Sequence, residues 1–397
     1  MLFRKEKHKP KMPLPENGGI RKELPMKKES LYGKKLLMVT PYTPDNQGVG
    51  VSYTSQLLKE LAKTCIIDLV YFRYKEEQTY TPPNPNIRVI YEKVLHSKDK
   101  IIYVLKHPSI FPLFTSRHDK SVVVLLQKRV EEYNYDYLYF DFSQTFSLAN
   151  EIEHPNKILM SHDVIAQKYS RMKRVFRPWA MFSERKMLKA GRIVFTFSEK
   201  DCLLIKNLYG VESKPTTFFL NPNVIAAEPT EESNYFVFFG NWSRVENIEA
   251  LEWFLDNVYD CLPKMFNYKV IGGGRMPEAM KQKLIQAPNV EYVGFVDDPY
   301  KIIANAKAVI ASLHMGAGVK VKCVEALGSG TPIIGTEVAF EGIGEKYRGA
   351  MFLANAPEEY ASIITSFNFP LEKKQQLKRF FIESYNNKQV LRYINEG

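Results

Sequence analysis

The sequence has few cysteines and no long apolar run. Its four cysteines are scattered over 397 residues without a CxxC spacing, which argues against a disulfide framework or a zinc site and favours a reducing cytoplasm. The most apolar windows, 101–105 and 121–126, are far shorter than the roughly 20 residues that a helix needs to cross a bilayer. The first residues carry charge without the apolar core of a signal peptide. We therefore expect a cytoplasmic protein, at most peripheral on the inner face of the cell membrane.

Acidic residues are outnumbered, and the imbalance is concentrated at one end of the chain. The net charge is +11, and residues 1–35, with eleven Lys/Arg and four Asp/Glu, contribute +7 of it. Because residues 1–30 also hold few large apolar side chains, we predict a disordered basic arm there. The arm is either a solvated tail or a segment attracted to anionic lipid, at about 1 kcal/mol per basic residue near the headgroups. No nucleic-acid-binding module accompanies the charge, so no nucleic-acid partner is predicted.

A second basic cluster occupies residues 168–192, where Glu184 is the one acidic residue. Apolar residues recur between the cations at roughly helical spacing, which predicts one long amphipathic helix. Such a helix can lie at a membrane surface, or it can pack its apolar side on a core and expose its basic side to water. The sequence does not choose between these. The apolar residues concerned are Met172, Val175, Phe176, Trp179 and Phe182.

Short apolar runs alternate with helix-length amphipathic segments along the chain. This alternation predicts parallel sheets with helices on both faces. It is interrupted once, by the polar stretch 221–234, and then restarts. The predicted fold is α/β, with two tandem doubly wound, Rossmann-like domains that face a cleft. The predicted divisions are 31–225, 226–375 and a helix in 376–397 that packs back on the first domain.

The strongest chemical signal is GAGVKVKCVEALGSGTPIIG, residues 316–335. Gly316 and Gly318 let the backbone approach a ligand closely, and a helix is predicted to open near Lys320, with free N–H groups and a positive dipole for a diphosphate. Lys320 and Lys322 add positive charge there. Glu325, in the early turns of that helix, is placed to accept two hydrogen bonds from a ribose diol.

This ordered combination resembles the nucleotide-binding motif of glycosyltransferase family 4, in the branch with GAGxxxKxxEA. The resemblance implies a GT-B fold in which residues 226–375 bind a nucleotide-diphosphate sugar, such as a UDP- or GDP-sugar, and residues 31–225 carry the acceptor. It implies no separate cofactor. Backbone around Gly316 and Val319 would meet the transferred sugar, Lys320 or Lys322 the diphosphate and Glu325 the ribose.

Other segments follow the order of the same family. FFGNWSRVENIEALEWF, 238–254, resembles the first strand–turn–helix of the second domain, where Arg244 would meet the donor phosphates. VEYVGFVDD resembles the segment that frames the base, with backbone at Phe295 and Val296 in contact with it. AGRIVFTFSEKD, 190–201, and FLNPNV, 219–224, resemble the end of the first domain and the linker. The likeness covers nearly the whole chain from Lys34.

The first domain offers two weaker candidates. Gly48 and Gly50 stand between the first predicted strand and helix, either as a tight turn or as a loop whose amides meet a phosphate or the sugar. His162, in KILMSHDV, follows a strand end directly and resembles the family's histidine that contacts the donor sugar. Asp163 would then orient the imidazole ring or cap the following helix.

The sequence departs from the family at one position. Many members carry a paired glutamate eight residues before the residue equivalent to Glu325, and this chain has Ala317 there. The identity of the sugar is therefore open. No metal is predicted, because Asp297 and Asp298 precede Pro299 and are typical of a helix start, while basic residues and a helix dipole can neutralise the leaving diphosphate.

The predicted function is a retaining, metal-independent hexosyltransferase in cell-surface polysaccharide or glycoconjugate synthesis. Its catalytic residues would be His162, Arg244, Lys322 and Glu325, and its acceptor a glycan or a lipid-linked sugar at an anionic membrane. An epimerase or phosphorylase on the same fold, or an inactive nucleotide-sugar-binding protein, remains an alternative. A nicotinamide-dependent oxidoreductase is disfavoured, because neither domain's first strand is followed by GxGxxG.

Overall fold

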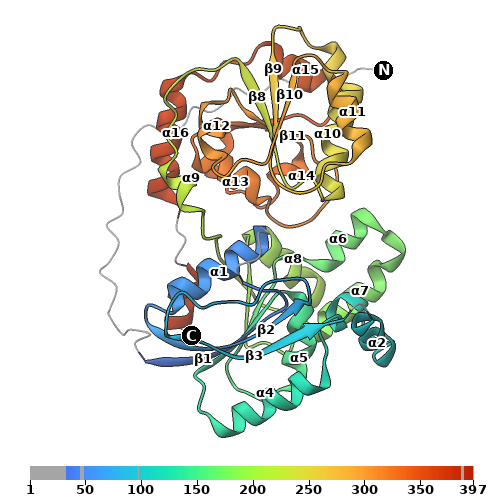
Figure 1. Cartoon of the computed structure of the whole chain (residues 1–397), viewed down its shortest axis with the longest axis vertical. Coiled ribbons are helices and arrows are strands. Elements are labelled where there is room, and N and C mark those ends of the chain that lie inside the picture. The colour runs from blue at the N-terminus through green and yellow to red at the C-terminus, as the bar shows by residue number, and fades with distance from the viewer. Residues whose placement is uncertain (1–32, 45–48, 97, 386–388, 397) are drawn as a thin grey trace, which may run out of the picture.

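The computed structural model describes residues 33–44, 49–96, 98–385 and 389–396. The predicted basic arm, residues 1–30, lies outside the described residues. The described chain forms two α/β domains, one above the other along the long axis (Figure 1). Both sheets are entirely parallel, so the predicted fold class is confirmed.

The first domain is built on a seven-stranded sheet of order β3-β2-β1-β4-β5-β6-β7. The interior strand β1 is buried on both faces: Leu36 and Met38 belong to one core cluster, whereas Leu37 and Val39 belong to the other, as the period of two in a strand requires. The strands are β1 (Lys34–Thr40), β2 (Cys65–Tyr74), β3 (Ile87–Leu95), β4 (Tyr137–Asp141), β5 (Lys157–Met160), β6 (Ile193–Thr196) and β7 (Lys214–Pro215).

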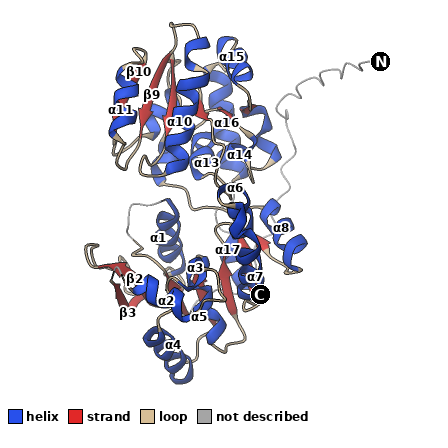
Figure 2. Ribbon diagram, turned by 90° about the vertical axis from the view of Figure 1, so that its right-hand side faces the viewer, coloured by secondary structure: helices blue, strands red, loops and turns tan. Residues whose placement is uncertain are grey.

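Helices cover both faces of this sheet (Figure 2). α1 supplies Leu57 and Leu61 to one core cluster, and α4 supplies Val122 and Leu126 to the other. The helical elements are α1 (Val49–Leu61), α2 (Asp99–Lys106), α3 (Pro112–Thr115), α4 (Lys120–Glu132), η1 (Ser143–Thr145), α5 (Phe146–Glu151), α6 (Ile165–Met172), η2 (Arg174–Phe176), α7 (Arg177–Leu188) and α8 (Glu199–Tyr209).

The second domain has a six-stranded sheet of order β10-β9-β8-β11-β12-β13. Its strands are β8 (Tyr235–Phe239), β9 (Asn267–Ile271), β10 (Val290–Gly294), β11 (Val309–Ala311), β12 (Ile333–Gly335) and β13 (Met351–Leu353). Its helical elements are α10 (Val245–Asn257), η3 (Tyr259–Cys261), α11 (Glu278–Ile285), α12 (Tyr300–Asn305), α13 (Val321–Gly328), α14 (Glu337–Phe340), η4 (Glu345–Ala350) and α15 (Pro357–Thr365).

Three helices connect the domains. The short α9 (Pro222–Ala226) lies in the linker, and α16 (Leu371–Ser384) packs Leu377 and Phe381 into the core of the second domain. The chain then returns to the first domain in α17 (Gln389–Glu396). There Ile394 is buried in the core, and its carbonyl oxygen accepts a hydrogen bond of 2.9 Å from the Tyr137 hydroxyl.

The single long helix predicted over 168–192 is wrong. The chain forms α6, ends it at Lys173 with φ −140° and ψ 76°, makes the turn η2 and restarts as α7. Pro178 stands in the first turn of α7, where a missing N–H costs nothing, whereas in a helix interior it would break a hydrogen bond and clash with the preceding turn. The basic segment therefore has two helical axes.

Candidate active site

A cavity of about 800 Å³ lies between the two domains. Loops from the carboxyl ends of both sheets line it, which is where doubly wound sheets bind ligands. Most of the predicted site residues meet there, although His162 and Glu325 are 163 positions apart in the sequence. Those that line the cavity are His162, Asp163, Arg244, Phe295, Val296, Gly316, Ala317, Val319, Lys320, Lys322 and Glu325.

Three predicted residues are not among the lining residues. Gly48 lies outside the described residues, and Gly50 falls in the first turn of α1. Gly318 faces the first domain instead: a Cβ placed there would stand 2.5 Å from Oδ1 of Asp163 and 3.0 Å from the carbonyl oxygen of His162. Gly318 therefore allows the two domains to touch, which is a role that the sequence did not reveal.

The donor loop, residues 314–320, connects β11 to α13. Gly316 and Gly318 have φ values of +103° and +67°, a region that side-chain-bearing residues rarely adopt. The loop ends at Lys320, the N-cap of α13, and Val321 and Lys322 in the first turn also line the cavity. The free amides and the positive end of the dipole at this helix start therefore meet the cavity.

Lys322 is a partly buried cation. Its Nζ donates a 2.8 Å hydrogen bond to Oδ1 of Asn247, and within the described parts of the chain no carboxylate lies within ion-pair distance of it. Burial lowers the pKa of Lys322 to about 8. Because a charge removed from water is stabilised by an opposite charge, the site favours an anionic ligand beside Lys322.

Lys320 is held by the loop itself. Its Nζ donates a 2.6 Å hydrogen bond to the carbonyl oxygen of Gly318 and lies 3.8 Å from Oε2 of Glu341. Burial lowers the pKa of Lys320, although the negative charge of Glu341 opposes this. The two lysines thus place positive charge at the N-cap and in the first turn of α13.

Glu325 lies one turn further along α13. Burial raises its pKa to about 7, and a hydrogen bond with Tyr300 of α12 works in the opposite direction. A carboxylate that is 9% exposed yet borders the cavity can accept hydrogen bonds from hydroxyl groups of a ligand, which would replace the lost solvation.

Two glycine-rich turns bring the other side of the cavity together. Gly272, with φ +130°, follows β9, and a Cβ there would collide with the carbonyl oxygen of Gly240 at the end of β8. Gly240 begins the turn that follows β8, and this turn ends at Arg244, the N-cap of α10. The Arg244 side chain is 60% exposed, with Glu246 3.8 Å away, so its guanidinium is accessible to a phosphate.

Phe295 and Val296 follow β10 on the same side of the cavity. The Phe295 side chain is 66% exposed, which is unusual for a large apolar ring in a cavity wall. An exposed ring of this kind can pack against the planar face of a base.

His162 is oriented by two residues that the sequence reasoning missed. Its Nε2 lies 2.7 Å from Oδ1 of the fully buried Asp141, and its ring stacks on Phe142 at 3.5 Å and 9°. A carboxylate acceptor requires the proton on Nε2, and the Thr54 hydroxyl donates to the same carboxylate. The sequence signal was available, because Asp141 and Phe142 end a predicted strand as His162 does.

Phe142 also carries backbone strain. Its φ is +60°, and it is the one residue other than glycine with positive φ among those described. Such strain costs of order 1–3 kcal/mol and tends to persist at functional sites. Phe142 lines the cavity beside His162.

Two sheets that face one cavity, with a phosphate-suited helix start on the second, define a GT-B architecture. Residues 233–367 match the model of the family described as glycosyl transferases group 1. The match covers the second domain, and over that part of the chain it confirms the resemblance to this class of enzymes that was read from the sequence. No significantly similar sequence is found among curated proteins.

Solved structures share the whole two-domain architecture. The sucrose-phosphate synthase of Thermosynechococcus elongatus aligns at a TM-score of 0.70 with 13% identity, over 91% of this chain and 96% of that one. TarM aligns at 0.65 with 13% identity, over 92% and 99%. HepE of Anabaena, in complex with UDP and glucose, aligns at 0.63 with 14% identity, over 92% and 100%. At these identities the likeness establishes the fold.

The described residues lack signs of a metal site and of a membrane span. They contain no group of three or more His, Cys, Asp or Glu side chains arranged to hold a metal ion. In the same part of the chain, no helix has the length and apolar character needed to span a bilayer.

Proposed function

We propose that the protein transfers a sugar from a nucleotide-diphosphate sugar to an acceptor, with retention of the anomeric configuration and without a metal. The observation that carries the proposal is the partly buried Lys322 beside the start of α13, with Glu325 one turn away in the same cavity. This pairing suits a diphosphate followed by a ribose. The role of the group 1 family supports the same reaction class.

The remaining cavity residues complete the donor site. Arg244 and Lys320 share the diphosphate with Lys322, and Phe295 and Val296 frame the base. As the glycosidic bond breaks, negative charge builds on the leaving diphosphate, and these fixed cations stabilise it more than the ground state. His162, held by Asp141 and Phe142, contacts the transferred sugar.

Retention is proposed by analogy with related enzymes. A trehalose-6-phosphate synthase whose structure is described in terms of glycosyltransfer with retention aligns at a TM-score of 0.55 and 11% identity. In a retaining transfer without a protein nucleophile, the acceptor hydroxyl attacks the face that the diphosphate leaves. Its proton then passes to a departing phosphate oxygen.

We propose a glycan or lipid-linked acceptor in cell-surface polysaccharide or glycoconjugate synthesis, reached at an anionic membrane face. The support is a mixed apolar and basic surface on the first domain, termed the α2–α7 face. The Trp179 indole of α7 donates to the carbonyl oxygen of Ser109, in the loop after α2, at 3.1 Å. The exposed apolar side chains of this face are Ile101, Leu105, Met172, Val175, Phe176 and Phe182, and its exposed cations include Lys98, Lys106, Lys173, Arg174, Arg185 and Lys186.

The donor site is tested with a panel of UDP- and GDP-sugars in a thermal-shift assay. A matching donor should raise the melting temperature of the wild type, because a ligand that binds only the native state stabilises it. Glu325→Ala should keep its fold but lose most of that shift and at least tenfold in turnover, since two hydrogen bonds to the ribose disappear.

The matched control is Glu345→Ala, whose carboxylate is exposed at the far end of an i,i+3 pair. It should behave as the wild type. Near-normal turnover in Glu325→Ala would remove Glu325 from the site, and a panel without any thermal shift would overturn the donor class. Release of free nucleotide that depends on an added acceptor distinguishes transfer from epimerisation.

A further inference from the structure

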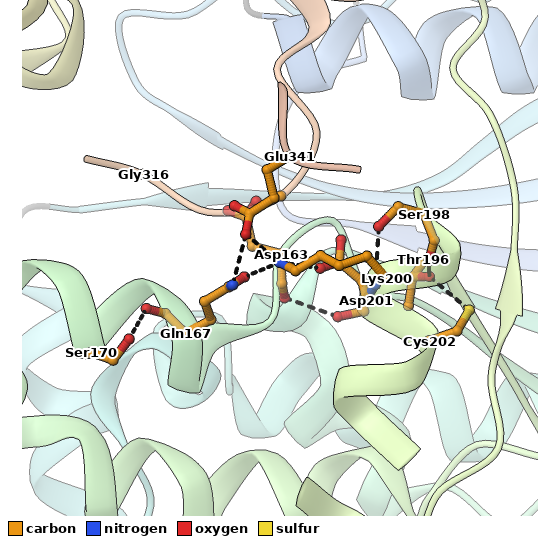
Figure 3. Close-up of polar contacts among 12 residues, drawn as sticks. Asp163, Gln167, Ser170, Thr196, Ser198, Lys200, Asp201, Cys202, Gly316 and Glu341 are labelled. Atoms are coloured by element: carbon orange, nitrogen blue, oxygen red, sulfur yellow. Dashed lines mark hydrogen bonds and ion pairs between the residues drawn. The ribbon is translucent and has the colours of Figure 1, made fainter. Parts of the chain in front are cut away.

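Glu341 of the second domain, just after α14, makes several polar contacts with the first domain. Its carboxylate accepts hydrogen bonds from both terminal nitrogens of Arg171, at 2.7 and 3.0 Å. The amide of Gln167 donates at 2.9 Å, and Nζ of Lys200 lies 2.6 Å away. Figure 3 shows Gln167 and Lys200 directed at Glu341, with Gly316 on the neighbouring loop. Three side chains from α6 and α8 thus converge on one carboxylate.

Arg171 has a second partner, and it is part of the donor loop. Its Nη1 donates to the carbonyl oxygen of Gly316 at 2.9 Å. The same guanidinium therefore binds Glu341 and the backbone of the loop that borders the cavity. A planar, forked cation can do both at once, whereas a lysine ammonium is a single point charge. Through Arg171, the first domain contributes directly to the shape of the donor loop.

Two glycines allow the domains to come this close. Gly318 would place a Cβ against Asp163, and Gly342, with φ +76°, would place one 2.6 Å from Cγ2 of Val319 and 2.8 Å from Cβ of Ser198. Side chains at either position would hold the domains apart. The contact is therefore built into the loop backbone and does not depend on the ion pairs alone.

The Glu341 side chain is 10% exposed, whereas its partners Arg171 and Lys200 are 27% and 34% exposed. Burial by itself would raise the pKa of Glu341, but the hydrogen bonds from Arg171 and Lys200 outweigh it and bring the pKa to about 2. A partly buried, multiply bonded ion pair of this kind is disrupted at a larger cost than a fully exposed pair, because removal of one partner leaves the other charge partly removed from water.

We propose that Arg171 is a positioning residue for the donor loop and that Glu341 holds it in place, together with Gln167 and Lys200. The loop takes the shape seen here when the two domains are closed, since its carbonyl at Gly316 is then bonded to Arg171. The proposal rests on the proposed function, in which this loop meets the donor. It predicts that productive donor geometry depends on a residue of the acceptor-side domain.

A contact that only held the domains together would affect stability and domain closure but not the conformation of the donor loop. The distinction lies in the second hydrogen bond of Arg171. Arg171→Lys can keep the charge pair with Glu341, yet a lysine cannot supply the same fork to Glu341 and Gly316. Under our proposal, Arg171→Lys loses most of the contribution that Arg171 makes to kcat. If Arg171 only held the domains together, Arg171→Lys would keep that contribution.

The experiment measures donor turnover and UDP affinity for wild type, Arg171→Lys, Arg171→Ala and Glu341→Ala. All three variants should lose at least tenfold in kcat, while the Kd for UDP changes less than threefold, because the second domain supplies most nucleotide contacts. The double variant Arg171→Ala/Glu341→Ala should be little worse than either single variant, as expected for residues that act as a unit. Arg348→Ala, which breaks an exposed pair with Glu345, is the matched control and should behave as the wild type.

Small-angle X-ray scattering gives a readout without activity. At saturating UDP, Arg171→Ala and Glu341→Ala should have a larger radius of gyration than the wild type, and Arg171→Lys should stay close to it. Wild-type kcat in Arg171→Lys, or unchanged kcat in Glu341→Ala, would overturn the positioning role. If the wild type itself bound no UDP and turned over no nucleotide-sugar, the proposed function would fail instead, so the two failures are distinguishable.

Discussion

At the scale of single residues, a buried carboxylate supports the polar network of the cleft. Glu184 of α7 accepts hydrogen bonds from the backbone amides of Ile165 and Ala166 at 2.8 and 2.9 Å and from the Tyr209 hydroxyl at 2.6 Å. It therefore caps the start of α6, the helix that carries Arg171, from a distance of nearly twenty positions. Local capping rules look for such an acceptor next to the helix start, so the sequence marked Glu184 merely as an isolated acid among cations.

Burial raises the pKa of Glu184 to about 7, against the opposing hydrogen bonds from Tyr209 and the two amides. The folded protein thus holds this proton more tightly than the unfolded chain, whose pKa is near 4.5. The associated stabilisation is present below pH 4.5 and is lost as the pH rises through 7, on the order of 3 kcal/mol in all. Glu184→Gln does not titrate, so we expect the free energy of unfolding of wild type minus variant to fall between pH 4.5 and 7.5.

Urea denaturation at several pH values measures that difference. Glu325 has a similar shift but is present in both proteins, so its effect cancels. The exposed Glu212→Gln, whose carboxylate pairs with Lys206 at the surface, should show a nearly constant difference. A constant difference for Glu184→Gln as well would show that Glu184 is ionised throughout.

At the scale of elements, the break between α6 and α7 separates two tasks. α6 turns Gln167 and Arg171 toward the second domain, while η2 and α7 expose Val175 and Phe182, at 80% and 66%, to solvent. One continuous helix would repeat its faces every 3.6 residues and could not direct both sets so independently. The kink therefore lets a single basic segment serve the cleft and an outer surface.

The outer surface leads to a prediction about lipid. Val175→Asp and Phe182→Asp should each weaken co-sedimentation with anionic vesicles at least fivefold, because each adds a negative charge and removes apolar area from the α2–α7 face. Met265 and Ile285, which are 74% and 73% exposed on the second domain, supply matched controls as Met265→Asp and Ile285→Asp. Equal sedimentation with neutral and anionic vesicles by the wild type would count against a membrane-bound acceptor.

At the scale of the whole molecule, the two sheets bring their carboxyl ends to one cavity, and α17 ties the end of the described chain to the first domain. The backbones of the two domains approach most closely at glycines, where no side chain stands between them. Gly318 is the sharpest case, because the nearest atoms to its absent Cβ belong to His162 and Asp163 of the other domain. The closed position of the domains therefore depends on the backbone of the donor loop.

Gly318→Ala should keep the cleft open. We expect a larger radius of gyration at saturating UDP and at least tenfold lower turnover, with UDP affinity changed only a few-fold. Gly210→Ala is a matched control for backbone strain, since Gly210 has the same φ of +67° but no atom within 4 Å of the added Cβ. A variant Gly318→Ala with wild-type turnover and compactness would show that the domains need not approach this closely.

Much of the fold could be predicted because it depends on local pattern. Gly210 ends α8 in a left-handed conformation with φ 67°, which a glycine after a helical segment favours, and short apolar runs form the strands of both sheets. The 168–192 helix was wrong because helical periodicity persists across a proline break, and β13 was missed because a three-residue strand carries too little signal. Helix and strand periods describe single segments, so they cannot report how segments meet.

The sequence by itself determined the alternation of strands and helices, the two-domain organisation and the glycine, lysine and glutamate order of the donor loop, since each is a property of consecutive residues. Tertiary structure alone decided that Asp141 and Phe142 orient His162, that Lys322 is partly buried without a carboxylate partner among the described residues, and that Arg171 reaches Gly316. These depend on the distances between loops at the ends of parallel strands and on the burial of each charge. Neither quantity exists until the two sheets have formed and face one another.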